Sequence, residues 1–216
     1  MRRQLAAHFG RLVGPERYPP IWRLVRSLIG CRTYDAVADA AMARVLGIWP
    51  HPGRLAAASP AQVERALGDV TYAGDKASHL VATLGWIGRE CRGFDLSFLK
   101  DRPVQDALAW LERFPGVGQK VAASTLNAST LRMRVFIVDS HVHRILKRFG
   151  FIGSRADPRG GRDAVTAAAG AFDADGLLEL FALLKRLGQT FCRFDRPACH
   201  ACPLAPRCKA ARRQAA

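Results

Sequence analysis

The stretch FPGVGQKVAAS, residues 114–124, places a proline and two glycines directly in front of a lysine, Lys120. Gly116 and Gly118 are free to take a positive φ or to let another backbone come close. The residues that follow have the composition of a helix, which we expect to begin near Gln119. The stretch therefore predicts a tight turn that leads into a helix.

A second helix is predicted on the other side of this turn, over residues 103–113. It begins with a proline, and its apolar residues Val104, Leu108 and Leu111 share one face. Two helices joined by a glycine turn leave unpaired amides at the start of the second helix, where they favour an anion such as a phosphate. The alternative is an ordinary helix corner in which the glycines serve packing alone. The candidate contacts to a DNA backbone are Gly116, Val117, Gly118 and Gln119.

The charge balance favours a polyanionic partner. The chain of 216 residues has 33 basic residues against 18 acidic ones, a net charge of +15. Such a field attracts nucleic acid, although a ribosome-like or merely soluble surface is the alternative. No apolar run approaches the roughly 20 residues of a membrane span, and basic residues interrupt the apolar start of the chain. We therefore expect a cytoplasmic, monomeric protein of the bacterial type, without a membrane segment.

The rest of the sequence has the pattern of one helix after another. One helix starts at Pro19–Pro20, and another at Ser59, its cap, with Pro60 in its first position. The run RMRVFIV, residues 132–138, is the one β-branched and aromatic run, and it has no partner with which to build a sheet. The predicted fold class is all-α.

Four of the six cysteines gather in CRFDRPACHACPLAPRC, residues 192–208. In a cytosolic chain such a cluster indicates a metal site rather than disulfides. Zinc takes four thiolates too, commonly as two close pairs, so it stays an alternative. The wide gaps in C-x6-C-x2-C-x5-C favour an iron–sulfur cluster instead. The candidate ligands are Cys192, Cys199, Cys202 and Cys208.

Lys120 and Asp139 are the candidate catalytic pair. A lysine set against the helix dipole and beside buried apolar residues can have a lowered pKa, which makes its amine a nucleophile. A surface lysine that holds a phosphate is the alternative. Asp139 precedes the predicted helix in DSHVHRILKRFG and is a good N-cap. It is also a candidate carboxylate at a reacting centre, because an amine and a carboxylate suit displacement at a sugar carbon.

Together, LERFPGVGQKVAASTLNAS, VDSHVHRILKR and the cysteine spacing resemble endonuclease III of the helix-hairpin-helix DNA glycosylases. The similarity extends to LIGCRTYD and YAGDKASHL. The resemblance implies a two-domain glycosylase fold, with a six-helix barrel, an iron–sulfur cluster domain and a DNA cleft between them. The expected ranges are 21–133 for the barrel, about 103–130 for its hairpin motif, 1–20 with 134–216 for the cluster domain, and 192–208 for the cluster loop.

The same resemblance implies an activity. It is that of a base excision repair glycosylase with abasic-site lyase activity, which removes oxidised pyrimidines from double-stranded DNA. Lys120 would attack the sugar C1′, expel the damaged base and form a Schiff base that allows β-elimination. Asp139 would assist the lysine and stabilise positive charge on the sugar. The nucleotide must first be flipped out of the duplex, and the four cysteines would hold a [4Fe-4S] cluster.

Two residues depart from the family pattern. Arg32 stands where the family usually has a glutamine that fills the gap left by the flipped base, and Tyr72 stands where a leucine often intercalates. Both side chains can stack on bases, so we expect them to contact DNA. The supporting residues implied by the resemblance are Asp35, Glu112 and His141.

Three alternatives stay open. An adenine-mismatch glycosylase is disfavoured by Lys120 and by the end of the chain soon after Cys208. A DNA-binding or lyase-only relative with an altered or reduced lesion range fits the changes at Arg32 and Tyr72; Lys120 and Asp139 count against a DNA-binding module that has lost base removal. A zinc-stabilised binding protein without chemistry is the third.

Overall fold

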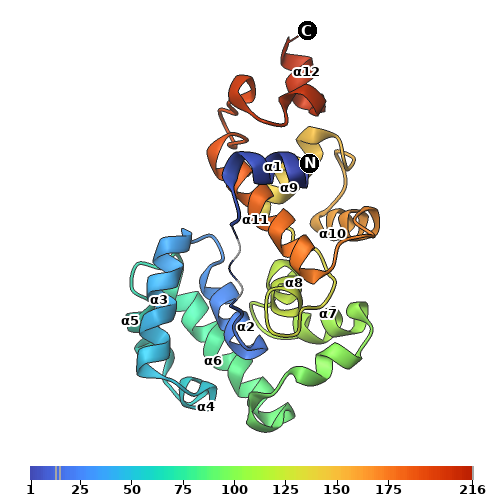
Figure 1. The fold of residues 1–216 in the computed structure, drawn as a ribbon. Coiled ribbons are helices and arrows are strands. Elements are labelled where there is room, and N and C mark those ends of the chain that lie inside the picture. The colour runs from blue at the N-terminus through green and yellow to red at the C-terminus, as the bar shows by residue number, and fades with distance from the viewer. Residues whose placement is uncertain (13, 15, 216) are drawn as a thin grey trace. The chain divides into compact units, whose positions relative to one another are not determined.

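The computed structural model describes residues 1–12, 14 and 16–215 of the chain. The chain divides into two compact units, Arg17–Met133 and a unit that joins Met1–Glu16 to Arg134–Ala216. Within the described residues every regular element is a helix, and the β structure is limited to one isolated bridge between Tyr18 and Ser129 (Figure 1). The prediction of an all-α fold is confirmed.

The Arg17–Met133 unit is built around a buried helix, α8. Its elements are α2 (Pro20–Ile29), α3 (Asp35–Ile48), α4 (Pro52–Ala56), α5 (Pro60–Leu67), α6 (Ala73–Glu90), the 3-10 turns η1 (Arg92–Phe94) and η2 (Ser97–Asp101), α7 (Val104–Glu112) and α8 (Gln119–Asn127). Residues 121–127 of α8 are all buried, and the helix packs against α2 and α7. Helix α6 packs against α4 and α5. The α7–turn–α8 hairpin is therefore part of the core of this unit.

Helix starts in this unit follow the local sequence. The Ser59 hydroxyl accepts a hydrogen bond from the Gln62 amide at 3.3 Å, and the Gln62 side chain accepts one from the Ser59 amide at 2.9 Å. This reciprocal pair caps α5, whose first residue is Pro60. Helix α8 begins at Gln119, where the glycine turn predicted it.

The other unit centres on two packed helices, α9 and α11. Its elements are α1 (Arg2–Phe9), α9 (Ser140–Phe149), α10 (Pro158–Ala168), α11 (Ala174–Thr190), the 3-10 turns η3 (Cys199–Ala201) and η4 (Ala205–Arg207), and α12 (Lys209–Ala215). Helix α1 packs against α11, and Arg2 forms an ion pair of 3.3 Å with Glu179. Gly188 of α11 lies so close to His141 of α9 that a Cβ there would meet the His141 Cβ at 2.7 Å. A glycine is what permits this helix contact.

The apolar run before Asp139 is buried without becoming a strand. Residues 135–138 are at most 3% exposed, and the Phe136 amide donates to the Thr166 hydroxyl at 3.2 Å. The segment delivers Asp139 to the start of α9 from a fixed, buried position. Among the described helices, none combines the length and the apolar character that a membrane crossing needs.

Candidate active site

The turn between α7 and α8 is held from inside the unit. The Val117 amide donates to the Phe114 carbonyl at 3.1 Å, which closes the turn. The Thr83 hydroxyl of α6 donates to the Pro115 carbonyl at 2.7 Å. Thr83 is fully buried and Val117 nearly so, so the turn is anchored by its own packing.

The two glycines of the turn have different reasons to be glycine. Gly116 has φ +73°, and a Cβ there would lie 2.9 Å from the ring of His79. Gly118 has an ordinary φ of −88°, and a Cβ there would meet nothing within 4 Å. Gly118 is the N-cap of α8, with no side chain hydrogen-bonded to its first-turn amides. Backbone amides at the start of a helix that no side chain caps, here those of Gln119 and its neighbours, suit an anion.

Lys120 lies in the first turn of α8 and is half-buried. Its Nζ is 3.4 Å from the carbonyl oxygen of Ser27, near the C-terminal end of α2. The Ser27 hydroxyl donates in turn to the Ser124 hydroxyl at 2.9 Å, and the Arg23 guanidinium reaches the same oxygen at 2.9 and 3.0 Å. Burial, followed by neighbouring cations, lowers the pKa of Arg23 to about 10, so it stays charged at neutral pH. These bonds fix α8, and with it Lys120, against α2.

A second lysine, for which the sequence predicted no role, reaches the same end of α2. Lys76 of α6 is only 7% exposed, and its Nζ donates to the carbonyl oxygens of Ile29 (2.8 Å) and Cys31 and to the Thr33 hydroxyl (2.9 Å). Burial lowers the pKa of Lys76, the Cys31 thiol opposes this, and the charge of Lys120 lowers it further. The two ammonium groups therefore lie within electrostatic range of each other.

Arg32 and Tyr72 come from separate turns and meet. Both are exposed, and both have a positive φ, 53° and 57°. The Arg32 guanidinium carbon lies 6.0 Å from the centre of the Tyr72 ring. Two candidate DNA contacts are thus brought side by side, each in a backbone conformation that is uncommon for residues other than glycine.

The two acidic support candidates of this unit lie at helix ends. Asp35 is the first residue of α3, and its carboxylate is 3.9 Å from Arg26, whose closer partner is Asp39 at 2.7 Å. Glu112 is the last residue of α7 and is half-buried. A carboxylate in the first turn of a helix is favoured by the dipole, so Asp35 stabilises α3 whatever else it does.

Asp139 and His141 belong to the other unit. Asp139 is the N-cap of α9, and its Oδ1 accepts a hydrogen bond from the Val142 amide at 2.8 Å. This confirms the capping interaction expected from the sequence. His141 lies in the first turn of α9, with its Nδ1 3.1 Å from the Arg144 guanidinium. The capping bond fixes the rotamer of the Asp139 carboxylate.

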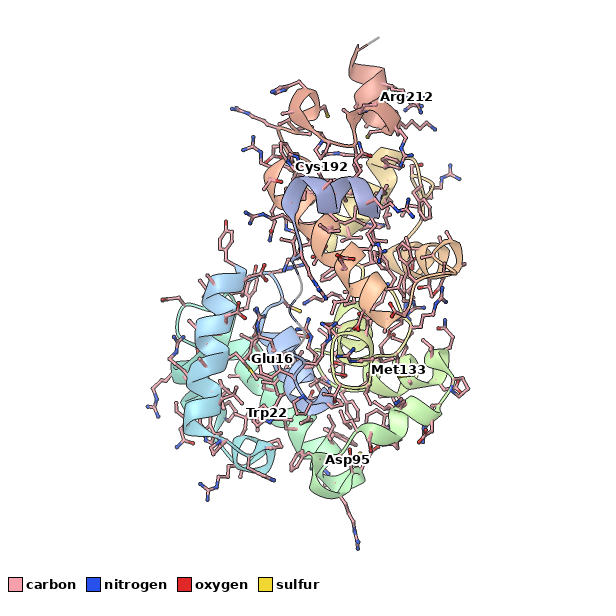
Figure 2. The ribbon with its side chains drawn as sticks, viewed as in Figure 1. Glu16, Trp22, Asp95, Met133, Cys192 and Arg212 are labelled. Carbon is pink, nitrogen blue, oxygen red and sulfur yellow. The ribbon has the colours of Figure 1, made fainter. Side chains whose placement is uncertain are left out.

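The cysteine loop begins where α11 ends (Figure 2). The Arg144 guanidinium donates to the carbonyl oxygen of Cys192 at 2.9 Å. One turn later on α9, Arg148 donates to the carbonyl oxygens of Arg193 (2.6 Å) and Phe194 (2.7 Å). Two arginines of α9 therefore hold the backbone at the start of the loop.

The four cysteine thiols are free and half-exposed. Burial, and then the charges of other cysteines in the loop, raise the pKa of the Cys199 and Cys202 thiols; for Cys202 these include Cys192, Cys199 and Cys208. Within the described residues, no three His, Cys, Asp or Glu side chains are gathered closely enough to hold a metal ion. The loop therefore fits a four-thiolate group by residue type, and the structure does not gather the four thiols into a metal site.

Comparison with known proteins places this geometry in a family. The HhH-GPD superfamily of base excision DNA repair proteins matches residues 25–165, which include the hairpin, Lys120 and Asp139. The chain belongs to this superfamily. The match ends before the cysteine loop at 192–208.

Individual relatives and solved structures agree with the expected resemblance to endonuclease III. The chain is 26% identical over 190 residues to an endonuclease III homologue of Encephalitozoon cuniculi, covering 86% of this chain and 76% of that protein. It is 33% identical to an adenine DNA glycosylase of Mycobacterium tuberculosis, covering 75% of this chain but 52% of that protein. A trapped endonuclease III–DNA covalent intermediate has the same fold, with a TM-score of 0.80, 18% identity, and coverage of 100% of this chain and 95% of that one.

The two glycines of the turn give a matched test. Gly116→Ala should lower the free energy of unfolding by about 2 kcal/mol, because alanine is strained at positive φ and its Cβ meets His79. Gly118→Ala should change it by less than about 1 kcal/mol, because its φ and surroundings accept a Cβ. Urea unfolding of both variants measures the difference. Equal losses would contradict this account of the turn.

Proposed function

We propose that this chain is a DNA glycosylase with abasic-site lyase activity that removes oxidised pyrimidines from double-stranded DNA. The observation that carries the proposal is the position of Lys120. Its amine lies directly after a glycine turn whose helix offers uncapped amides, in a chain of a base excision repair superfamily. The net charge of +15 suits a DNA substrate, and a cytoplasmic, nucleoid-associated location is part of the proposal.

In the proposed reaction the Lys120 amine is the nucleophile. Its lone pair attacks C1′ as the bond from C1′ to the base breaks, and the base leaves with the electron pair and takes up a proton. Loss of a proton from the nitrogen and opening of the sugar ring at O4′ give a Schiff base between Nζ and C1′. Removal of a C2′ proton then expels the 3′ phosphate, and water releases Lys120.

The proposed role of Asp139 is to stabilise positive charge on the sugar and to assist proton transfer from Lys120. A carboxylate with a fixed rotamer meets the requirement for preorganised electrostatic support. The hydrogen bond from the Val142 amide supplies that rigidity and uses one of the two carboxylate oxygens. The proposal requires Asp139 to act together with Lys120 on the same nucleotide.

The cysteine loop is proposed to hold a [4Fe-4S] cluster, and the two units are proposed to be the barrel domain and the cluster domain. A cluster bound by four thiolates would cross-link the loop and stabilise its fold. Arg144 and Arg148 prepare the loop by fixing its first three residues from α9. The proposed ligands are Cys192, Cys199, Cys202 and Cys208.

An adenine-mismatch glycosylase is the second candidate function. The observation that favours it is the 33% identity to the adenine DNA glycosylase of Mycobacterium tuberculosis. The two candidate functions differ in the role of Lys120. The glycosylase with lyase activity forms a covalent intermediate and needs Lys120 as its nucleophile, whereas the adenine-mismatch glycosylase does not form this intermediate. A trapping experiment therefore separates them.

Sodium borohydride should trap a covalent protein–DNA complex on a duplex that contains one thymine glycol, and on a duplex that contains one abasic site. Lys120→Ala should lower the yield of both complexes at least about a thousandfold, because the nucleophile is gone. Gel electrophoresis of the labelled DNA measures the yield.

The matched control is Lys100→Ala, which removes an exposed lysine of η2 and should trap as the wild type does. Trapping on the abasic duplex alone would restrict the protein to lyase chemistry. Absence of trapping on both, with release of adenine from a duplex carrying adenine opposite a damaged guanine, seen as a strand break only after alkali treatment, would favour the second candidate.

Cys202→Ser should lower the iron content of the purified protein well below four atoms per chain and weaken its broad visible absorbance, because a cluster needs all four thiolates. The control is Cys91→Ala, which changes a buried cysteine of the other unit. Metal analysis and absorbance measure the result. A colourless wild-type protein with one zinc ion per chain would contradict the proposed cluster.

A further inference from the structure

Lys76 has an environment that an ordinary surface lysine does not have. Its side chain is 7% exposed, and all three ammonium hydrogens have an acceptor: Ile29 O, Cys31 O and Thr33 Oγ1. Burying an ammonium is costly unless it is fully hydrogen-bonded. A chain that needed only packing here would be served better by an apolar residue of similar length.

The acceptors of Lys76 flank Arg32. Cys31 precedes Arg32 in the chain and Thr33 follows it, so the ammonium holds the turn on both sides of the arginine. On its own helix, the Lys76 amide donates to the Tyr72 carbonyl at 3.1 Å. The Lys76 side chain thus bonds to the turn of Arg32, while its backbone makes the ordinary first helical hydrogen bond of α6, to the N-cap residue Tyr72.

Both turns store backbone strain. Arg32 and Tyr72 each have a positive φ without being glycine, which costs on the order of 1–2 kcal/mol per residue. Such conformations persist where the surroundings over-determine them, and they concentrate at functional sites. The buried side-chain bonds of Lys76 tie the strained turn of Arg32 to the first turn of α6, the helix that begins directly after Tyr72.

We propose that Lys76 is a positioning residue that fixes Arg32 and Tyr72 as one rigid pair, which fills the space left when a nucleotide is flipped out of the duplex. This inference rests on the proposed function. The Arg32 guanidinium carbon lies 6.0 Å from the centre of the Tyr72 ring, so a cationic and an aromatic side chain that can each stack on bases lie side by side. Without the Lys76 bonds, the turns of Arg32 and Tyr72 would become ordered only on DNA binding, and this ordering would reduce the binding free energy.

The test uses a duplex with a stable abasic-site analogue and the fluorescent base 2-aminopurine opposite it. Insertion of the pair should change the fluorescence of the opposite base in the wild type. Lys76→Met keeps the length of the side chain but donates no hydrogen bond. It should weaken binding to this duplex about tenfold and leave binding to undamaged duplex within about twofold. Lys100→Met, the control for a lost charge, should leave both unchanged.

A double-mutant cycle separates positioning from general stability. In the Arg32→Ala/Tyr72→Ala background, Lys76→Met should weaken binding to the abasic duplex by no more than about twofold, because the residues through which it acts are gone. A tenfold loss in both backgrounds would overturn the inference. Should Lys76→Met not fold, Thr33→Val removes a single acceptor and should weaken binding in the same direction by a smaller factor.

The outcomes also separate this inference from the proposed function. A wild-type protein that binds abasic and undamaged duplexes equally would remove the proposed function, and the inference with it. A wild-type protein that prefers the abasic duplex, together with a Lys76→Met variant that behaves identically, would leave the function standing and overturn the positioning role alone.

Discussion

The C-terminal end of α2 is the constraint on which the candidate site depends. The last carbonyl groups of a helix have no partner inside it, so they must find donors elsewhere. Here Lys120 of α8 donates to Ser27 O, and Lys76 of α6 donates to Ile29 O. Two cations at the negative end of the helix dipole are favourable individually, although they repel each other. The proposed nucleophile is therefore placed by the backbone of a helix that is distant in sequence.

The same end of α2 links the proposed chemistry to the proposed DNA contacts. Lys76 continues past the helix to the turn that carries Arg32, and its own helix begins beside Tyr72. The C-terminal end of α2 thus anchors the half-buried Lys120 amine and, through Lys76, the turn that carries the exposed Arg32. In a protein that must hold a flipped nucleotide while a covalent bond forms, common anchoring keeps the two events in fixed geometry. Arg32 and Tyr72, which differ from the endonuclease III pattern, then belong to one anchored part of the structure.

The sequence predicted those parts of the site that depend on local chemistry. The glycine turn, the start of α8 at Gln119 and the capping by Asp139 follow from neighbouring residues, and the structure has all three. The role of Lys76 was missed because its acceptors lie more than 40 residues away. A signal was present: Lys76 lies in line with the buried residues of α6, including Leu80 and Leu84, where a lysine needs partners. Long-range hydrogen bonds of this kind have no periodic pattern in a sequence.

The proposed chemistry depends on a covalent bond between Lys120 and the sugar. The most direct measurement is to trap the wild-type protein on an abasic duplex with borohydride, digest the complex with nuclease and protease, and locate the deoxyribose remnant by tandem mass spectrometry. We expect the remnant on Lys120 alone. A remnant on Lys76, on another lysine or on the N-terminal amine would contradict this expectation, because the nucleophile would then lie outside the first turn of α8.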